Sequence, residues 1–288
     1  MSRKEFPIPV VSIGPGSQDE GEGEEQLSYI QMPREMHTFS MPSLPSPEQA
    51  RDAAEARAAV RWLWEAARDW RPGSANRSFD ASVLDAHNRE IVDQVLGEGE
   101  VSVIVSGERE TRAQESVFTG VWRVRAVNHD GSVGLDSIEV GPVPAIVRSA
   151  ALAAASPAVP ELPPPADAFG APPIVEEVAH HAAVRKPGDP AHVINLSLLP
   201  LSPSDAGYLG EVLAAGPVRI LSRGYGNCRI TSPVVTDTWW VQYVNGYGNP
   251  MVDSIEITDV PEVAVASPED IADSAERLHE AYEWLEKG

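Results

Sequence analysis

The sequence predicts an α+β protein made of two tandem repeats, each a helix followed by a three-stranded antiparallel sheet, with an added N-terminal helix and a C-terminal helix. The first observation is an internal duplication: Trp122 and Trp239 lie 117 positions apart, and the same offset relates Asp136–Glu139 to Asp253–Glu256. Between Val95 and Pro144, 19 of 50 positions match their counterparts without a gap, far above chance. The second observation is that both copies show a helical pattern followed by alternating apolar segments.

Helix signals open the first repeat. Ser46-Pro47-Glu48-Gln49 combines an N-cap, a proline at the first helical position and a capping-box residue, and predicts a helix that continues to about Trp70. A second helix is expected from about Asp85 to Leu96, ended by Gly97. Strands are expected at 101–105, 117–127 and 135–140.

The same order returns in the second repeat. Ser202-Pro203 caps a helix that ends near Leu213, and strands are expected at 218–221, 234–244 and 252–257. A last helix begins at Ser267, and its apolar stripe predicts that it lies across a sheet or a partner. That stripe comprises Ile271, Ala275, Leu278, Tyr282 and Leu285.

Composition shifts divide the chain into four parts. Residues 1–45 form a mobile arm with an acidic run and several prolines, and 46–150 hold the first repeat with its N-terminal helix. Residues 151–190 are an Ala- and Pro-rich connector with a short helix around 174–184. Residues 191–288 hold the second repeat, which begins with an extended segment at 193–199.

The charge of the chain excludes some classes of partner. A formal net charge of −21 argues against nucleic acid and against an acidic membrane surface, because both are bound through Lys and Arg. No apolar run is long enough for membrane insertion, and the first residues lack the pattern of a secretory signal. We therefore expect a cytoplasmic protein.

Catalytic and cofactor motifs are not found in the sequence. There is no nucleophile elbow, phosphate-binding loop or complete dinucleotide fingerprint, which indicates that the protein is not an enzyme and carries no cofactor. No two histidines have the i, i+4 spacing of a helical zinc site, so no metal centre is expected. Two other hypotheses stay open: a nickel or zinc role for His180 and His181, and a redox role for Cys228.

A partner-binding site is predicted in the second repeat, where it differs from the first. A Gly-Tyr-Gly loop exposes backbone and an aromatic ring, and Trp240 stands where the first repeat has Arg123. Trp239, which shares its position with Trp122, is expected in the core. The predicted contact residues are Gly224, Tyr225, Gly226, Asn227, Cys228, Trp240, Pro261, Glu262, Glu269 and Asp270.

Several segments, in order along the chain, together resemble the HupH/HyaF/HoxQ family of [NiFe]-hydrogenase expression and maturation proteins. They include Leu96–Ser102, Gly120–Arg125, His192–Pro200, Gly224–Gly226 and Val260–Ser274, within a match from about Phe39 to Leu285.

The resemblance implies a non-catalytic accessory factor. Its expected partners are the iron–sulfur small-subunit precursor of the hydrogenase, bound before export, and a thioredoxin-like chaperone of the HyaE/HoxO type. The alternative implied by the family is a nickel metallochaperone or nickel-incorporation factor for the large subunit. A lone cysteine and scattered histidines favour the chaperone.

Overall fold

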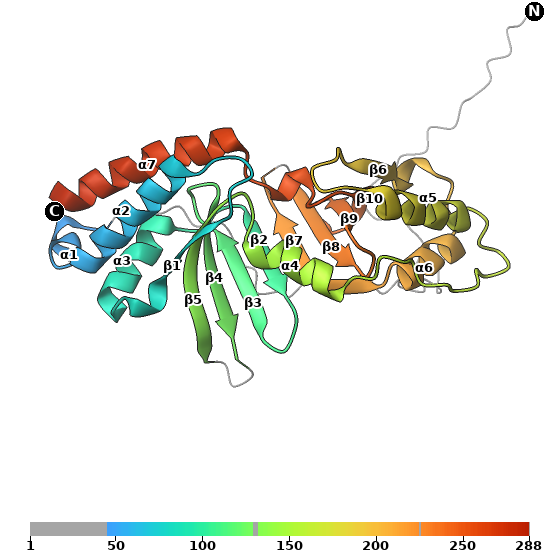
Figure 1. Cartoon of the computed structure of the whole chain (residues 1–288), viewed down its shortest axis with the longest axis horizontal. Coiled ribbons are helices and arrows are strands. Elements are labelled where there is room, and N and C mark those ends of the chain that lie inside the picture. The colour runs from blue at the N-terminus through green and yellow to red at the C-terminus, as the bar shows by residue number, and fades with distance from the viewer. Residues whose placement is uncertain (1–44, 129–131, 225, 288) are drawn as a thin grey trace, which may run out of the picture. The chain divides into compact units, whose positions relative to one another are not determined.

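The computed structural model describes residues 45–128, 132–224 and 226–287. The arm expected over residues 1–45 therefore lies outside the described residues, except for Pro45. The described residues have the α+β architecture that the sequence predicts, with helices packed on a single ten-stranded sheet (Figure 1). Within these ranges, none of the helices has both the length and the apolar composition that a bilayer span requires.

The sheet is antiparallel throughout, and its strand order is β1-β5-β4-β3-β2-β7-β8-β9-β10-β6. One side of the sheet comes from the first half of the chain and the other side from the second half. The strands are β1 (Arg77–Asp80), β2 (Val101–Val105), β3 (Glu110–Glu115), β4 (Val121–Val127), β5 (Val133–Val140), β6 (His192–Asn195), β7 (Ala215–Ser222), β8 (Asn227–Pro233), β9 (Thr238–Val244) and β10 (Pro250–Ile257).

The two halves join through β2 and β7, which we call the seam. Val103 pairs with Ile220, its own counterpart 117 positions later. On either side of this pair, Val101 faces Ser222 and Val105 faces Val218. Each copy thus contributes the same strand to the contact, as in a two-fold symmetric interface between identical subunits.

The prediction of three strands per repeat is wrong, because each half contributes five strands to one continuous sheet. The segment 117–127, expected to be one strand, is a turn followed by β4, and β3 precedes it. The missed β3 reads Glu-Thr-Arg-Ala-Gln-Glu, which has few of the branched and aromatic residues that mark strands. Strand β1 is only four residues long and its residues are mostly exposed.

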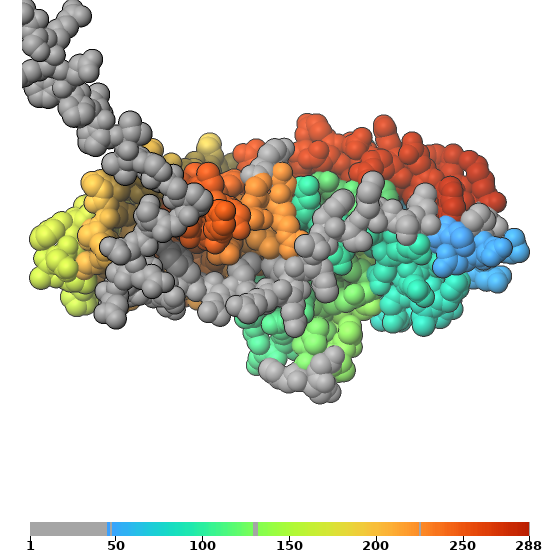
Figure 2. All heavy atoms as spheres, turned by 180° about the vertical axis from the view of Figure 1, so that it is seen from behind, coloured from blue at the N-terminus to red at the C-terminus, as the bar shows by residue number. Residues whose placement is uncertain are grey.

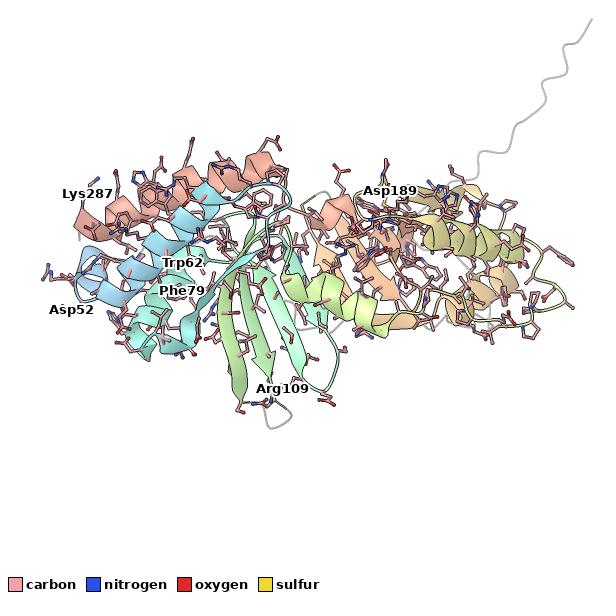
Figure 3. All side chains as sticks on the ribbon, in the orientation of Figure 1. Asp52, Trp62, Phe79, Arg109, Asp189 and Lys287 are labelled. Carbon is pink, nitrogen blue, oxygen red and sulfur yellow. The ribbon has the colours of Figure 1, made fainter. Side chains whose placement is uncertain are left out.

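Helices from both ends of the chain cover the first half. They are α1 (Pro47–Arg51), α2 (Ala54–Asp69), α3 (Ala86–Leu96) and α7 (Pro268–Lys287). Ser46 and Gln49 form the predicted capping box, but the expected long helix breaks after Arg51 and resumes as α2. Figure 3 shows Trp62 of α2 and Phe79 of β1 pointing towards one another, with ring centroids 5.6 Å apart.

The predicted stripe on α7 is confirmed. Ile271, Ala275, Leu278 and Leu285 are buried in one cluster with apolar residues of α2, α3 and the sheet, and Tyr282 packs at its margin. The space-filling view shows α7, in red, against this half of the structure (Figure 2). The last helix of the sequence therefore completes the core of the first repeat.

Two further cores lie along the sheet. The central core contains Trp122 and Trp239. It is covered by α4 (Ala145–Ala154), a helix that the sequence did not predict. The core of the second half is covered by α5 (Ala171–Val184) and α6 (Pro203–Val212). Short 3₁₀ turns complete the fold: η1 (Ala81–Val83), η2 (Leu196–Leu198) and η3 (Glu262–Ala264).

The paired tryptophans make the same interactions. The indole N–H of Trp122 donates to the carbonyl of Gly141 at 3.0 Å, and that of Trp239 donates to the carbonyl of Thr258 at 3.2 Å. Both rings are fully buried, so the prediction that Trp239 belongs to the core is confirmed. Their acceptors are themselves 117 positions apart, so the duplication extends to side-chain hydrogen bonds.

Candidate functional site

A cavity of about 640 Å³ opens where the seam meets the start of α7. Its walls come from the chain entering β2, the end of β3, the end of β7, and the segment that joins η3 to α7. The cavity therefore draws on both halves of the chain. We call it the seam cavity.

Acidic side chains dominate the seam cavity. Among the described residues, Glu100, Glu115, Glu262 and Asp270 line it, together with one cationic side chain, that of Arg277. The Arg277 guanidinium also donates to the carbonyl of Val117 at 2.9 Å and lies over the ring of Phe118. Four carboxyl groups around one hollow favour a cationic ligand, and low-dielectric walls strengthen that preference.

Glu115 is the buried member of this group, with a relative exposure of 5%. Burial raises the pKa of its carboxyl group to about 7. The N–H groups of Gly120 and Val101 bind the carboxylate and oppose this rise, while Glu100 and Asp270 add to it. Glu115 is thus poised to change its charge near neutral pH.

Gly120 supplies one of the two backbone N–H groups that donate to the Glu115 carboxylate. Its N–H lies 3.2 Å from the Glu115 Oε1 atom, in a turn where the φ angle of Gly120 is +82°. A side chain here would meet Ile271 of α7, whose Cγ1 atom lies 2.5 Å from an ideal Cβ position. Glycine therefore permits both the turn and the close approach of α7.

The structure brings three of the predicted contact residues together. Gly224, Glu262 and Asp270 all line the seam cavity, and Glu100 of the first half packs directly against Gly224. Glu269 is exposed on the first turn of α7 but is not in the cavity wall, and Pro261 is buried just before η3.

The other predicted contact residues in and after the Gly-Tyr-Gly loop differ in their exposure. Gly226 and Asn227 are exposed, and Tyr225 lies outside the described residues. Cys228 is not on the surface: it has a relative exposure of 1% and belongs to the central core. Burial raises the pKa of its thiol to about 12, so the reactive thiolate is disfavoured, which argues against both the contact and the redox roles.

Trp240 is half-buried and bonded within the protein. Its indole N–H donates to the carboxylate of Asp253, and Gln242 donates to the same group at 3.2 Å. In the first repeat the equivalent aspartate, Asp136, forms ion pairs with Arg123 and Arg125. Trp240 therefore replaces a buried cation as the partner of this aspartate, which gives it a structural role.

Sequence reasoning missed Glu100 and Glu115. The difference between the two repeats could have identified Glu115, because the second repeat has Ser232 at the same position. The Ser232 hydroxyl accepts the N–H of Val218, just as the Glu115 carboxylate accepts the N–H of Val101. The second repeat has a small buried hydroxyl at this position, and the first has an ionisable acid. Such a difference between the copies indicates a functional role for the acid.

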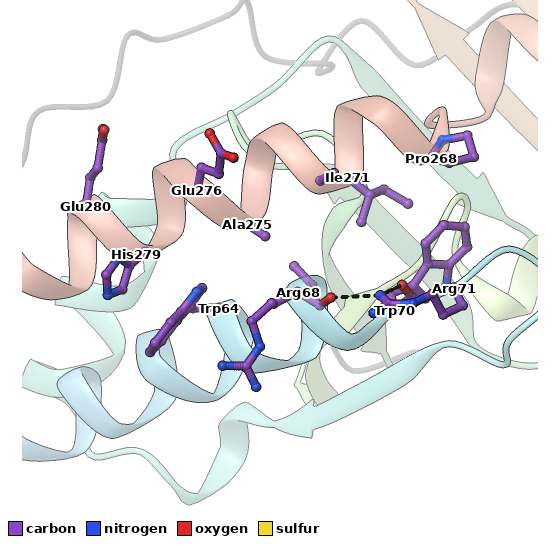
Figure 4. Close-up of a pocket in the computed structure, with 12 residues that line it drawn as sticks. Trp64, Arg68, Trp70, Arg71, Pro268, Ile271, Ala275, Glu276, His279 and Glu280 are labelled. Carbon is purple, nitrogen blue, oxygen red and sulfur yellow. Dashed lines mark hydrogen bonds between the residues drawn. The ribbon is translucent and has the colours of Figure 1, made fainter.

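A second hollow of about 450 Å³ lies between α2 and α7 (Figure 4). The ring of Trp64 lies at a tilt against that of His279 there, with centroids 4.2 Å apart, and Arg68 lies over the same indole. The indole N–H of Trp70 has no hydrogen-bond partner among the described residues. This hollow is lined by side chains that already contact one another, so we regard it as a packing groove.

One group of side chains has the composition of a metal site. Glu177, His181 and His192 each place a potential ligand atom within 4.8 Å of the other two. His180, the other member of the predicted histidine pair, is exposed and outside this group.

Comparison with known proteins adds the family. The model of the family described as "HupH hydrogenase expression protein, C-terminal conserved region" matches residues 53–158 and 168–285, one segment in each half. The hydrogenase expression/formation protein HoxQ of Cupriavidus necator is 44% identical, over 97% of this chain and 98% of that protein. The hydrogenase-1 operon protein HyaF of Escherichia coli is 32% identical, over 95% of each chain.

Among solved structures, a hydrogenase expression protein HupH from Thiobacillus denitrificans is 28% identical, with a TM-score of 0.34, over 38% of this chain and 92% of that one. The chain belongs to the HupH family of hydrogenase expression proteins. The family resemblance read from the sequence is therefore confirmed.

Proposed function

We propose that this protein is a non-catalytic maturation factor for a hydrogenase, and that it acts as a chaperone that binds the small-subunit precursor before export and assembly. The observation that carries the proposal is family membership over nearly the whole chain, since the relatives are named for hydrogenase expression and formation. The buried Cys228 thiol also argues against redox chemistry by the chain itself.

The seam cavity is the proposed contact site, and its ligand is a basic segment of the precursor. Glu100, Glu262 and Asp270 present carboxylates at the wall, and Glu115 gains negative charge when a cation approaches, because a nearby positive charge lowers a carboxyl pKa. Binding should therefore strengthen between pH 6 and 8 and weaken as salt rises.

Two further expectations belong to the same proposal. We expect the protein to act in the cytoplasm, where the precursor is found before export. We also expect it to work with a thioredoxin-like chaperone of the HyaE/HoxO type, which supplies the thiol chemistry that a chain with a single buried cysteine lacks.

Co-purification of the tagged protein with the small-subunit precursor tests the function. A triple variant, E100Q/E262Q/D270N, tests the site, and we expect it to lose most of the captured precursor. Its matched control, E108Q/E161Q/E211Q, removes the same charge from exposed residues outside the cavity. If the unaltered protein captures no precursor, the chaperone role is wrong, and if both triple variants capture it equally, the cavity is the wrong site.

The alternative role in nickel delivery to the large subunit has one structural observation in its favour, the group formed by Glu177, His181 and His192. Capture of the large-subunit precursor in place of the small-subunit precursor would favour this alternative. The two roles therefore differ in the subunit that co-purifies.

A further inference from the structure

Two elements of the second half bring two histidines and a glutamate to one place. Glu177 and His181 lie one turn apart on α5, so both project from the same side of the helix. His192 is the first residue of β6, which follows α5 after the loop in which Figure 3 labels Asp189. The three side chains meet where the last turn of the helix passes the edge strand.

The three side chains are already in contact. The Nε2 atom of His192 lies 2.7 Å from the Glu177 Oε1 atom. The imidazole rings of His181 and His192 are stacked, with centroids 3.5 Å apart and an angle of 9° between their planes. Because Glu177 is exposed and both histidines are partly exposed, the rings have room to turn towards a shared ion.

We propose that Glu177, His181 and His192 bind one divalent transition-metal ion of the Zn²⁺ or Ni²⁺ type. Two imidazole nitrogens and one carboxylate oxygen are a donor set that suits Zn²⁺ and Ni²⁺, whereas Mg²⁺ and Ca²⁺ require oxygen ligands. Three protein ligands leave at least one coordination position open, so the ion can accept a further ligand or be passed on.

The surroundings of the three side chains favour a cation. His181 lies in the last turn of α5, where the helix dipole attracts positive charge. The site stands independently of the proposed precursor binding, because it needs no residue of the seam cavity.

Metal binding to the purified full chain tests the proposal, with Ni²⁺ and Zn²⁺ in calorimetry and Co²⁺ as a spectroscopic probe. We expect one ion per chain. The variants H181A, H192A and E177Q should each weaken binding by at least about tenfold, since even partners that only orient a ligand change affinity by 10–100-fold. At the same concentration, added Zn²⁺ should raise the unfolding temperature of the unaltered protein more than that of H181A.

Matched controls separate this site from adventitious binding. H180A removes the neighbouring exposed histidine, E176Q removes a neighbouring exposed carboxylate, and H279A removes the histidine of a Glu–His pair on α7. All three should bind the metal as the unaltered protein does. Equal loss in H180A and H181A, or affinity unchanged in H181A/H192A, would overturn the proposal.

Discussion

At the scale of single residues, the informative positions are those at which the two repeats differ. Glu115 and Ser232 occupy the same place and accept the same backbone N–H, yet one is an acid and the other a hydroxyl. A buried acid at this position costs stability that a serine does not. We attribute the presence of this destabilising acid to the seam cavity, which Glu115 lines and Ser232 does not.

Replacing Glu115 by glutamine should stabilise the protein in a pH-dependent way. The pKa of Glu115 is about 7 in the folded state against an ordinary 4.5, so between these values the folded chain keeps a proton that the unfolded chain has lost. The free energy of unfolding therefore falls as pH rises from 4.5 to 7, by up to roughly 3 kcal/mol. E115Q lacks this fall and should exceed the unaltered protein in stability at pH 8 but not at pH 4.5.

Urea unfolding followed by tryptophan fluorescence at several pH values measures this difference. E108Q is the matched control, because Glu108 is exposed in the turn before β3. A gap between E115Q and the unaltered protein that stays constant from pH 4.5 to 8 would contradict the assignment.

Trp240 offers a second residue-scale prediction. Trp240→Phe keeps an aromatic ring against the core of α5 and α6 but removes the N–H that Asp253 accepts. Burial already raises the pKa of Asp253, so loss of this donor leaves the carboxylate poorly compensated. We expect a loss of about 1–3 kcal/mol in the free energy of unfolding, with no change for Tyr247→Phe, whose ring is 94% exposed. An unchanged denaturation midpoint for Trp240→Phe would rule out the structural role.

At the scale of elements, the sequence predicted best what depends on local chemistry. The capping box at Ser46, the N-cap at Ser202, the cap at Gly97 and the apolar stripe on α7 are all present, because each depends on residues close together along the chain. Strand β3 was missed because its polar residues become a strand only through pairing with β2 and β4. Such pairing depends on the neighbouring strands, so the residues of the segment alone do not predict it.

The candidate site shows the same division. Gly224, Glu262 and Asp270 were recognised because they lie in segments peculiar to the second repeat. Glu100 and Glu115 were not, since their proximity to these residues arises from the β2–β7 pairing, which no local pattern reveals. Cys228 was misplaced because alternation along β8, a strand that was not predicted, decides that it faces the core.

The turn between β3 and β4 provides the prediction at this scale. Gly120→Ala places a methyl group within 2.5 Å of Ile271 and forces a non-glycine residue to a φ angle of +82°. Overpacking costs about 1–3 kcal/mol and the backbone conformation about 1 kcal/mol more. Gly73→Ala is the matched control, because Gly73 has a φ angle of +83° with nothing within 4 Å. Equal losses in both variants, measured by urea unfolding, would show that contact with α7 contributes nothing.

At the scale of the whole described structure, the two repeats are not independent units. The seam gives them one sheet, and the central core takes Trp122 from one repeat and Trp239 from the other. The seam cavity exists only because the halves meet there. The two copies of the fold therefore form one sheet, and the seam cavity lies at their junction, where the two copies differ in sequence.

Helix α7 makes the strongest case for this interdependence, because it follows the second repeat in sequence and completes the core of the first. Its buried Ile271, Leu278 and Leu285 account for roughly 5–9 kcal/mol of apolar burial, a large part of the stability of about 5–15 kcal/mol that most domains possess. Deleting residues 268–288 should therefore unfold α2 and α3, and hydrogen exchange should show the loss of their amide protection. Helices α5 and α6 should stay protected for longer, because they belong to a separate core. Deleting only 286–288 removes surface ion pairs and should change little. Retained protection of α2 in the longer deletion would mean that the first repeat is stable without α7.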